Sequence, residues 1–429
     1  MNSQESTPIN NNPINPLIGI QAKAAKKIGF TGKAVNYVMF RAKKNFAMSL
    51  ALGIMCLLSY PLAMIALSVY AGAWKFDIMH ADEISNGDFT SATDDSFGFV
   101  LICILVACCC MLGVVLITYM NAAGGYRYHT AKEDVDGYYS LPLTRKQLFF
   151  ADFFAGLSPV IIGYVLSSGI GLAIYYGVVQ PIIKSVPDSA LIDEGNTGIF
   201  MENTLFNFDT FKLIVGAMGT GLIFLIFTFV FGSFITSLSA RVHDSVILPV
   251  VFQTAFTAGV AIIYSIATIN SGSFEDDSTG IKILLYVLIL LTPIGFLTGS
   301  EVLPMLNIEN LYGLYGGRFS VADIAKELPI FRLELIIPLI SVMICYVILA
   351  YFLTEQRLAE RTGERGGFRY VYHTVITMAT FDIVGFYYVI MGGNPFSADG
   401  GVFGGMILTT AIVYLLYELV AMKNFKKLH

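Results

Sequence analysis

The chain has 429 residues, of which 55% are hydrophobic and only 13% charged, and its formal net charge is −5. A soluble domain carries roughly 25% charged residues because its surface must face water, so this composition excludes a soluble globular protein. Most of the outer surface is predicted to face lipid. The six cysteines all lie in apolar runs and lack the spacing of zinc ligands, and we expect no metal site.

Two segments precede the first apolar run. Residues 1–17 are rich in Asn, Pro and Ser and lack an apolar core, which predicts a disordered cytoplasmic tail and no signal peptide. Residues 18–45 interleave basic and apolar side chains, which is typical of an amphipathic helix lying in the membrane interface. Lys27 and Ala34 stand where a P-loop needs Gly and Ser or Thr, and no other stretch fits that motif. We therefore expect no nucleotide-binding motif, and no enzymatic activity, in this chain.

Nine apolar runs are candidates for membrane spans, each of which needs roughly 20 residues. The positive-inside rule places the basic N-terminal segment, loop 122–152 and the basic loop 356–370 in the cytoplasm. It places the acidic loop after the first run, and the acidic loop 181–212, outside. The nine runs are residues 46–71, 97–121, 153–180, 213–238, 245–269, 281–298, 333–354, 371–392 and 402–422.

The run 281–298 differs from the others. A full crossing there would put both loop 356–370 and the Lys-rich C-terminal tail outside, against the positive-inside rule. The run is also interrupted by a proline, Pro293, which removes a backbone donor. We therefore predict a re-entrant hairpin, which must be buried in protein or face a cavity. The predicted fold is all-α: a polytopic membrane helix bundle of about eight spans with both termini cytoplasmic, in which residues 371–429 form the last two spans and a tail.

A polar stretch, YYSLPLTRKQL at residues 138–148, lies in the cytoplasmic loop 122–152. Pro142 favours an extended residue before it and can start a helix after it, and Thr144 can cap that helix. Residues 139–148 resemble the permease subunits of ABC-2 type transporters, which place a similar LP-[VIL]-[ST]-R segment between their second and third spans. Residues 355–364, EQRLAERTGE, look like the loop after the sixth span in larger permeases of this group from Gram-positive bacteria. The resemblance covers roughly residues 20–355, and the last two spans depart from the six-span pattern.

The resemblance implies an ABC-2 type (type V exporter-like) core over residues 46–355 in a bacterial plasma membrane. It implies a second permease chain as partner, in a homo- or heterodimer, and ATP-binding subunits that bind ATP and Mg in place of this chain. The loop would dock into a groove on such a subunit; alternatively, its basic residues only fix the topology. The candidate docking residues are Glu133, Asp134, Asp136, Tyr139, Ser140, Leu141, Pro142, Thr144, Arg145 and Lys146.

Two carboxylates fall inside predicted spans, where a charge costs at least ~2.5 kcal/mol on insertion scales and marks a candidate site. Glu418 lies near the Lys-bearing end of the last span and can be balanced by Lys423. Asp382 lies mid-span and could bind a cationic substrate, relay protons or hydrogen-bond to a neighbouring helix. Gln253 and Asn121 are expected to join helices through hydrogen bonds.

The leading hypothesis is the permease subunit of an ABC transporter that exports a lipid, peptide or drug-like substrate. The alternatives are an ion-coupled secondary transporter that uses Asp382, and a non-transporting membrane sensor or scaffold. Membrane lipid is expected as a partner and nucleic acid is not.

Overall fold

The structure is a computed structural model that describes residues 30–80, 91–126, 143–185, 209–239, 242–271, 291–296, 333–356 and short pieces between 373 and 415. These residues are almost entirely helical and contain no strand, which confirms the all-α class for this part of the chain. The helices are α2 (Phe30–Lys44), α3 (Phe46–Met79), α5 (Ala92–Gly125), α8 (Arg145–Ile174), the π-helical turn η1 (Tyr175–Val179), α9 (Gln180–Lys184), α11 (Asp209–Leu238), α12 (Val242–Ser271) and α16 (Leu333–Gln356).

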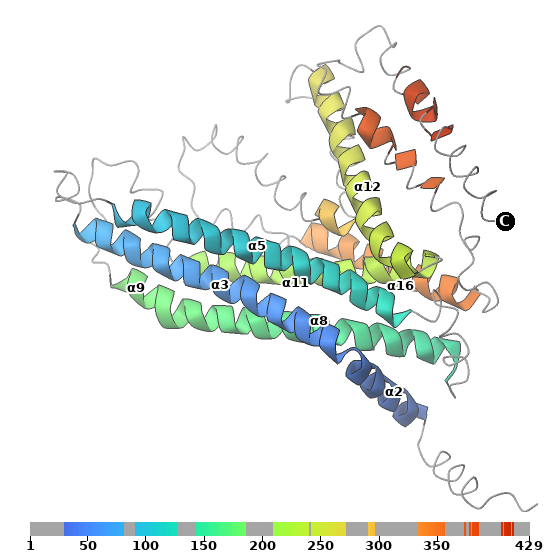
Figure 1. The fold of residues 1–429 in the computed structure, drawn as a ribbon, viewed down its shortest axis with the longest axis horizontal. Coiled ribbons are helices and arrows are strands. Elements are labelled where there is room, and N and C mark those ends of the chain that lie inside the picture. The colour runs from blue at the N-terminus through green and yellow to red at the C-terminus, as the bar shows by residue number, and fades with distance from the viewer. Residues whose placement is uncertain are drawn as a thin grey trace, which may run out of the picture.

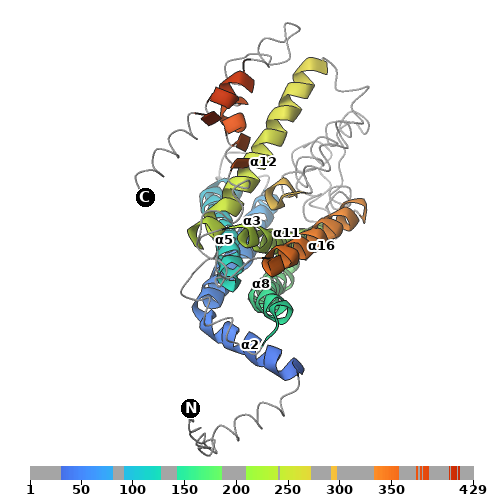
Figure 2. The same cartoon turned by 90° about the vertical axis from the view of Figure 1, so that its right-hand side faces the viewer.

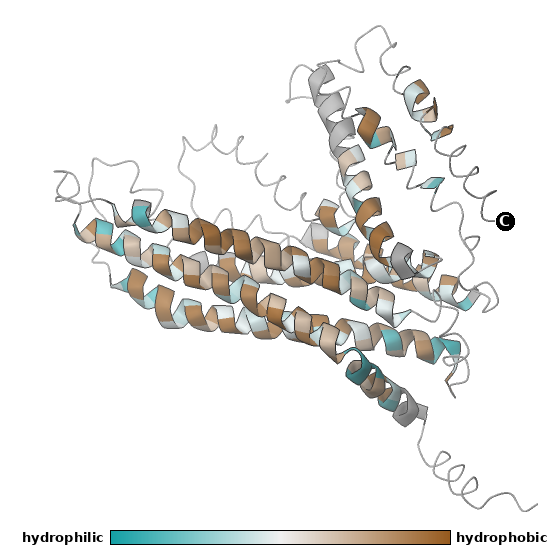
Figure 3. Cartoon of the chain, in the orientation of Figure 1, coloured by the Kyte–Doolittle hydropathy of each residue, from teal (hydrophilic) through white to brown (hydrophobic). Residues whose placement is uncertain are grey.

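Five helical segments in the described residues are long and apolar enough to cross a membrane. Their middles are apolar and their polar residues lie toward the ends, as Figure 3 shows for α3, α5 and α8. They overlap five of the predicted runs, and they identify a helical membrane bundle. The segments are Phe46–Met79, Asp95–Gly125, Arg145–Lys184, Ile214–Leu238 and Ile336–Glu355.

The remaining predicted runs are described only in part. The run 245–269 lies within α12, whose described apolar stretch, Ser245–Gly259, is shorter than a span. Of the predicted re-entrant segment only residues 291–296 are described, and there Gly295 N donates to Thr292 Oγ1 at 3.1 Å as a short turn begins at Pro293. The tail 1–17, most of runs 371–392 and 402–422, and the path of the predicted hairpin lie outside the described residues.

The spans are longer than the apolar runs that predict them. α8 begins at Arg145, well before the predicted start at 153, and α5 continues to Gly125. Both ends of the predicted loop 122–152 are therefore helical, and the connection between α5 and α8 is shorter than expected. Hydropathy marks where the apolar face begins, whereas the helix itself begins at its cap, one turn or more earlier.

The third span contains a single π turn where α8 passes through η1 into α9. Pro181 lies in the first turn of α9. Proline has no N–H to donate, and its ring clashes with the carbonyl four residues earlier in an α-helix. The π turn lies directly before Pro181, whereas Pro61 and Pro159 lie inside regular α-helix, and Arg145–Lys184 remains one continuous candidate span.

Four spans, α3, α5, α8 and α11, run side by side (Figure 1), and α11 lies among α5, α8 and α16 in the view nearly along the bundle (Figure 2). Of its most apolar window 56% is buried, against 11–28% for the other four. α12 begins beside α11 and then rises steeply away from the bundle (Figures 1 and 2). α11 is therefore the central helix of the described bundle.

Hydrogen bonds join the spans at several buried positions. Tyr119 on α5 donates to Gln253 Oε1 on α12 at 2.7 Å, and Asn121 Nδ2 donates to the Gly156 carbonyl of α8 at 2.6 Å. Both residues expected to join helices, Gln253 and Asn121, are confirmed in that role. Tyr164 on α8 donates to the Met218 carbonyl of α11 at 2.7 Å, so the central helix is also tied to α8.

Candidate functional site

One end of the bundle brings together elements that are far apart in the sequence. A buried cluster there joins α2, the end of α5, the start of α8 and the end of α16. We call it the α2 end. Its buried members are Tyr37, Tyr126, Leu148, Phe149, Ala151 and Ala350. Because the C-terminal part of loop 122–152 leads directly into α8, the α2 end carries the described part of the predicted docking site.

The start of α8 is fixed by a capping box. Thr144 has extended backbone angles, its hydroxyl accepts a hydrogen bond from Gln147 N at 3.3 Å, and its own N donates to Gln147 Oε1 at 2.9 Å. Two backbone donors that a helix start leaves unpaired are thereby satisfied. The prediction that Thr144 caps a helix is confirmed.

The next two residues connect α8 to α16. Arg145 Nη1 donates to the Glu355 carbonyl at 3.1 Å. Lys146 Nζ lies 5.7 Å from the ring centroid of Tyr351, a cation–π distance. Glu355 is the first residue of the second stretch that resembles the ABC-2 permeases, so the two resembling stretches meet in space.

A buried ion pair anchors α2 to α8. Arg41 Nε lies 3.3 Å from Asp152 Oδ1, with side-chain exposures of 3% and 0%, and Tyr37 donates to the same oxygen at 2.9 Å. The end of α5 closes over the pair, because a Cβ at Gly124 would lie 4.0 Å from Arg41 Nη2. Charges this deeply buried are stable only when paired, so the contact fixes how α2 lies on α8.

Sequence reasoning missed the ion pair for identifiable reasons. Asp152 precedes the predicted start of the third span by one residue, so it was not counted among the intramembrane carboxylates. The local sequence, FFADFF, does contain a signal for the pair. The four flanking phenylalanines offer the Asp152 carboxylate no polar partner, so a partner from another part of the chain is expected. Arg41 lies among the basic residues that orient the chain, and nothing in its immediate sequence sets it apart from them.

The helix predicted within 18–45 is present in the described part, Phe30–Lys44, and its two faces differ. Tyr37 and Arg41, four residues apart, face the protein, whereas Val35, Met39 and Phe40 are exposed. In the described part of α2, large apolar side chains therefore face outward and the central arginine faces inward.

Most of the other candidate residues lie outside the described part of the chain. Asp382 is described, on a helical turn at residues 380–385; the residue is 9% exposed, and Oδ1 lies 2.9 Å from where a Cβ at Gly259 would stand. The described residues contain no group of His, Cys, Asp or Glu that could hold a metal ion. The candidates outside are Glu133, Asp134, Asp136, Tyr139, Ser140, Leu141, Pro142 and Glu418.

Comparisons with protein-family models, with curated proteins and with solved structures found no match for this chain. No relative's site can therefore be transferred to the α2 end.

Proposed function

We propose that the chain is the transmembrane permease subunit of an ABC-2 type transporter. It pairs with a second permease chain in a bacterial plasma membrane, with both termini in the cytoplasm, and exports a lipid, peptide or drug-like substrate. ATP and Mg bind to separate ATP-binding subunits, which dock against the loop that ends at Thr144.

The observation that carries this proposal is the hydrogen bond between Arg145 and the Glu355 carbonyl, 210 residues apart in the sequence. The resemblance rests on two separate stretches, and the topology it implies puts both on the cytoplasmic side. The contact between them supports that arrangement, with the start of α8 beside the end of α16.

The contacts at the α2 end also suit a coupling role, in which the loop that ends at Thr144 transmits movement of the docked subunit to the helices. The Thr144 capping box holds the first turn of α8 in place at the point where the loop enters the helix. Arg145 and Lys146 carry that movement to α16, and the Arg41–Asp152 pair carries it to α2. ATP-driven movement of the docked subunit thereby reaches three helices of the bundle.

The test is co-purification of the full chain from its own cells in a mild detergent. The wild-type chain should retain an ATP-binding subunit, and Arg145→Glu should reduce that retention at least tenfold. Lys184→Glu, the same charge reversal on an exposed residue at the end of the third span, is the matched control and should retain it. Equal retention by both variants, or no ATP-binding subunit with the wild type, overturns the proposal.

A second function, ion-coupled secondary transport, is favoured by one observation. Asp382 packs against α12 at Gly259, and its Oδ2 has no hydrogen-bond partner in the described part of the chain. A carboxyl group in such surroundings can take up and release a proton. Proton-driven uptake by the purified chain in liposomes, lost in Asp382→Asn, would establish this function; uptake that needs ATP and an added subunit would exclude it.

A further inference from the structure

The described turn of the predicted re-entrant segment, residues 291–296, is tied to α16. Tyr346 lies near the middle of the candidate span Ile336–Glu355, and its hydroxyl donates to the Leu291 carbonyl at 2.8 Å. Leu291 stands before the helical residues of the turn. The bilayer core holds no water that could hydrogen-bond to such a carbonyl, so the protein must supply the donor. Tyr346 supplies it.

The same turn is packed against other parts of the bundle. Phe296 is 2% exposed and belongs to the buried hydrophobic cluster around α11. Thr292 is fully buried, and its hydroxyl oxygen lies 3.5 Å from that of Thr257 on α12. The turn therefore lies between α16 and α12 and is buried in protein.

The ring of Tyr346 is oriented by aromatic contacts with α11. It stacks on Phe234 with ring centroids 4.8 Å apart and on Phe227 at 6.3 Å, and it meets Phe231 edge-on at 5.7 Å. The three phenylalanines are four and three residues apart, so they share one face of α11. This packing directs the Tyr346 hydroxyl at the turn.

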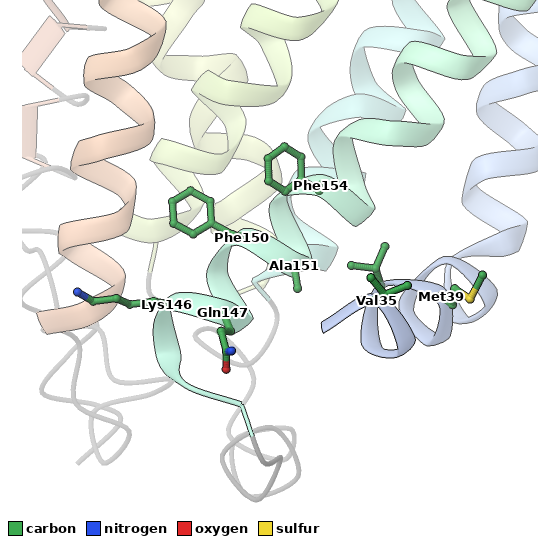
Figure 4. A pocket seen from close by; sticks show the side chains of 8 residues that line it. Val35, Met39, Lys146, Gln147, Phe150, Ala151 and Phe154 are labelled. Atoms are coloured by element: carbon green, nitrogen blue, oxygen red, sulfur yellow. The ribbon is translucent and has the colours of Figure 1, made fainter. Parts of the chain in front are cut away.

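The other end of α16 contacts the start of α8. Arg145 donates to the Glu355 carbonyl, and the Lys146 ammonium lies over the ring of Tyr351. Figure 4 shows the Lys146 side chain extending toward α16 and away from α2. One helix thus contacts both the proposed docking end and the turn at residues 291–296.

The part of α16 between these two contacts is suited to transmit movement. The nine residues from Tyr346 to Glu355 rise about 14 Å as one continuous helix, because the only proline of α16, Pro338, lies before them. The most apolar window of α16 is 11% buried, the smallest share among the five candidate spans. Elements with few buried contacts are the ones that move most readily.

We propose that Tyr346 is a positioning residue that couples α16 to the turn at residues 291–296. Nucleotide binding by the docked subunit displaces the start of α8 and with it α16, and the Tyr346 hydroxyl carries that displacement to the turn. The inference rests on the proposed function, and it names the turn as the part that moves within the membrane.

The test is hydrogen exchange, followed by mass spectrometry, of the chain in complex with its co-purified ATP-binding subunit. Adding a non-hydrolysable ATP analogue to the wild-type complex should change the exchange rate of residues 291–296 at least threefold. Tyr346→Phe keeps the ring and removes the hydroxyl, so it should lose this response while keeping the subunit and the response of residues 145–150. Ser341→Ala removes a hydroxyl that donates to the Ile337 carbonyl within α16, and as the control it should respond like the wild type.

The outcomes separate coupling from a structural role of the hydroxyl. If Tyr346→Phe exchanges faster at residues 291–296 but responds to the analogue as the wild type does, the hydroxyl only stabilises the turn and the proposal is overturned. A wild-type complex that responds at residues 145–150 and not at 291–296 also overturns it, and the proposed transport function then stands. A wild-type chain that retains no ATP-binding subunit overturns the transport function and this inference together.

Discussion

At the residue scale, Asp152 decides how the N-terminal helix is attached. Its carboxylate accepts from Tyr37 and pairs with Arg41, and both partners come from α2. Deeply buried charges of this kind gain little over an apolar pair of the same size, but losing one partner leaves the other charge buried alone. The pair therefore contributes more to fixing the position of α2 on α8 than to the stability of the fold.

The buried pair predicts a distinct pattern among variants. Asp152→Ala should lower the stability of the purified chain by about 3–5 kcal/mol, because Arg41 remains buried without its counter-charge. The double variant Arg41→Met with Asp152→Leu should recover most of that loss. Thermal unfolding in detergent measures both, with Lys43→Met, a loss of charge at an exposed neighbour, as the control. A double variant that melts as low as Asp152→Ala contradicts the role given to the pair.

Gly221 on the central helix α11 provides a second residue-scale prediction. A Cβ there would overlap the Tyr164 hydroxyl and would stand 2.6 Å from the Tyr60 hydroxyl. Gly221→Ala should therefore cost about 1–3 kcal/mol through overpacking. Gly72→Ala is the matched control, because its Cβ meets nothing within 4 Å, and it should be neutral or stabilising by up to about 1 kcal/mol. Equal melting temperatures for the two variants would show that the tyrosines move aside freely.

At the scale of single elements, two helix starts in the described part of the chain are fixed by side chains, one at each end of the bundle. At the end opposite to α2, the Asp77 carboxylate from the last part of α3 accepts from Ala92 N at 2.7 Å, Thr93 N at 2.9 Å and the Ser91 hydroxyl at 2.8 Å. An acceptor from a neighbouring helix thus caps α5, a role that no pattern within α5 itself reveals.

Loss of this cap should loosen α5 and leave α8 unchanged. Hydrogen bonds to a charged group contribute about 1.5–3 kcal/mol each, so Asp77→Ala should expose the first turn of α5 to solvent. Hydrogen exchange followed by mass spectrometry should show faster exchange in residues 92–96 and no change in residues 145–150. Unchanged exchange in residues 92–96 would mean that packing alone holds the helix start.

The capping box at Thr144 gives the corresponding prediction at the α2 end. Thr144→Ala should cost about 1 kcal/mol and speed hydrogen exchange in the first turn of α8. Thr144→Ser keeps the hydroxyl and should exchange like the wild type. If the two variants exchange alike, the first turn is held by Arg145 and Lys146 through α16 and the cap is dispensable.

At the scale of the whole molecule, hydropathy predicted five of the described spans because the length of an apolar run is a local property of the sequence. The start of α8 was also predictable, since Pro142 and Thr144 act on their immediate neighbours. The contacts that build the α2 end were not predictable in this way. The ion pair of Arg41 with Asp152 and the contact of Arg145 with Glu355 join residues with no local relation, and only the packing of the helices brings them together.

The difference in span lengths has a separate, local cause. Hydropathy and charge counting mark where the apolar run begins, whereas the Thr144 cap marks where the helix begins, so Arg145 and Lys146 already belong to α8. These residues serve both as orientation signals and as contacts to α16. Arg145 and Lys146 thus contribute both to the topology of the chain and to the packing of α8 against α16.

The central claim is that the α2 end receives an ATP-binding subunit. Site-specific photocrosslinking in whole cells tests it most directly, with a photoreactive residue at Leu143, next to the α8 cap, or at Ser185, at the far end of the same span. We predict that the residue at position 143 crosslinks to a protein with a P-loop and that the residue at position 185 does not. Crosslinks to such a protein from position 185, or from neither position, would contradict the claim.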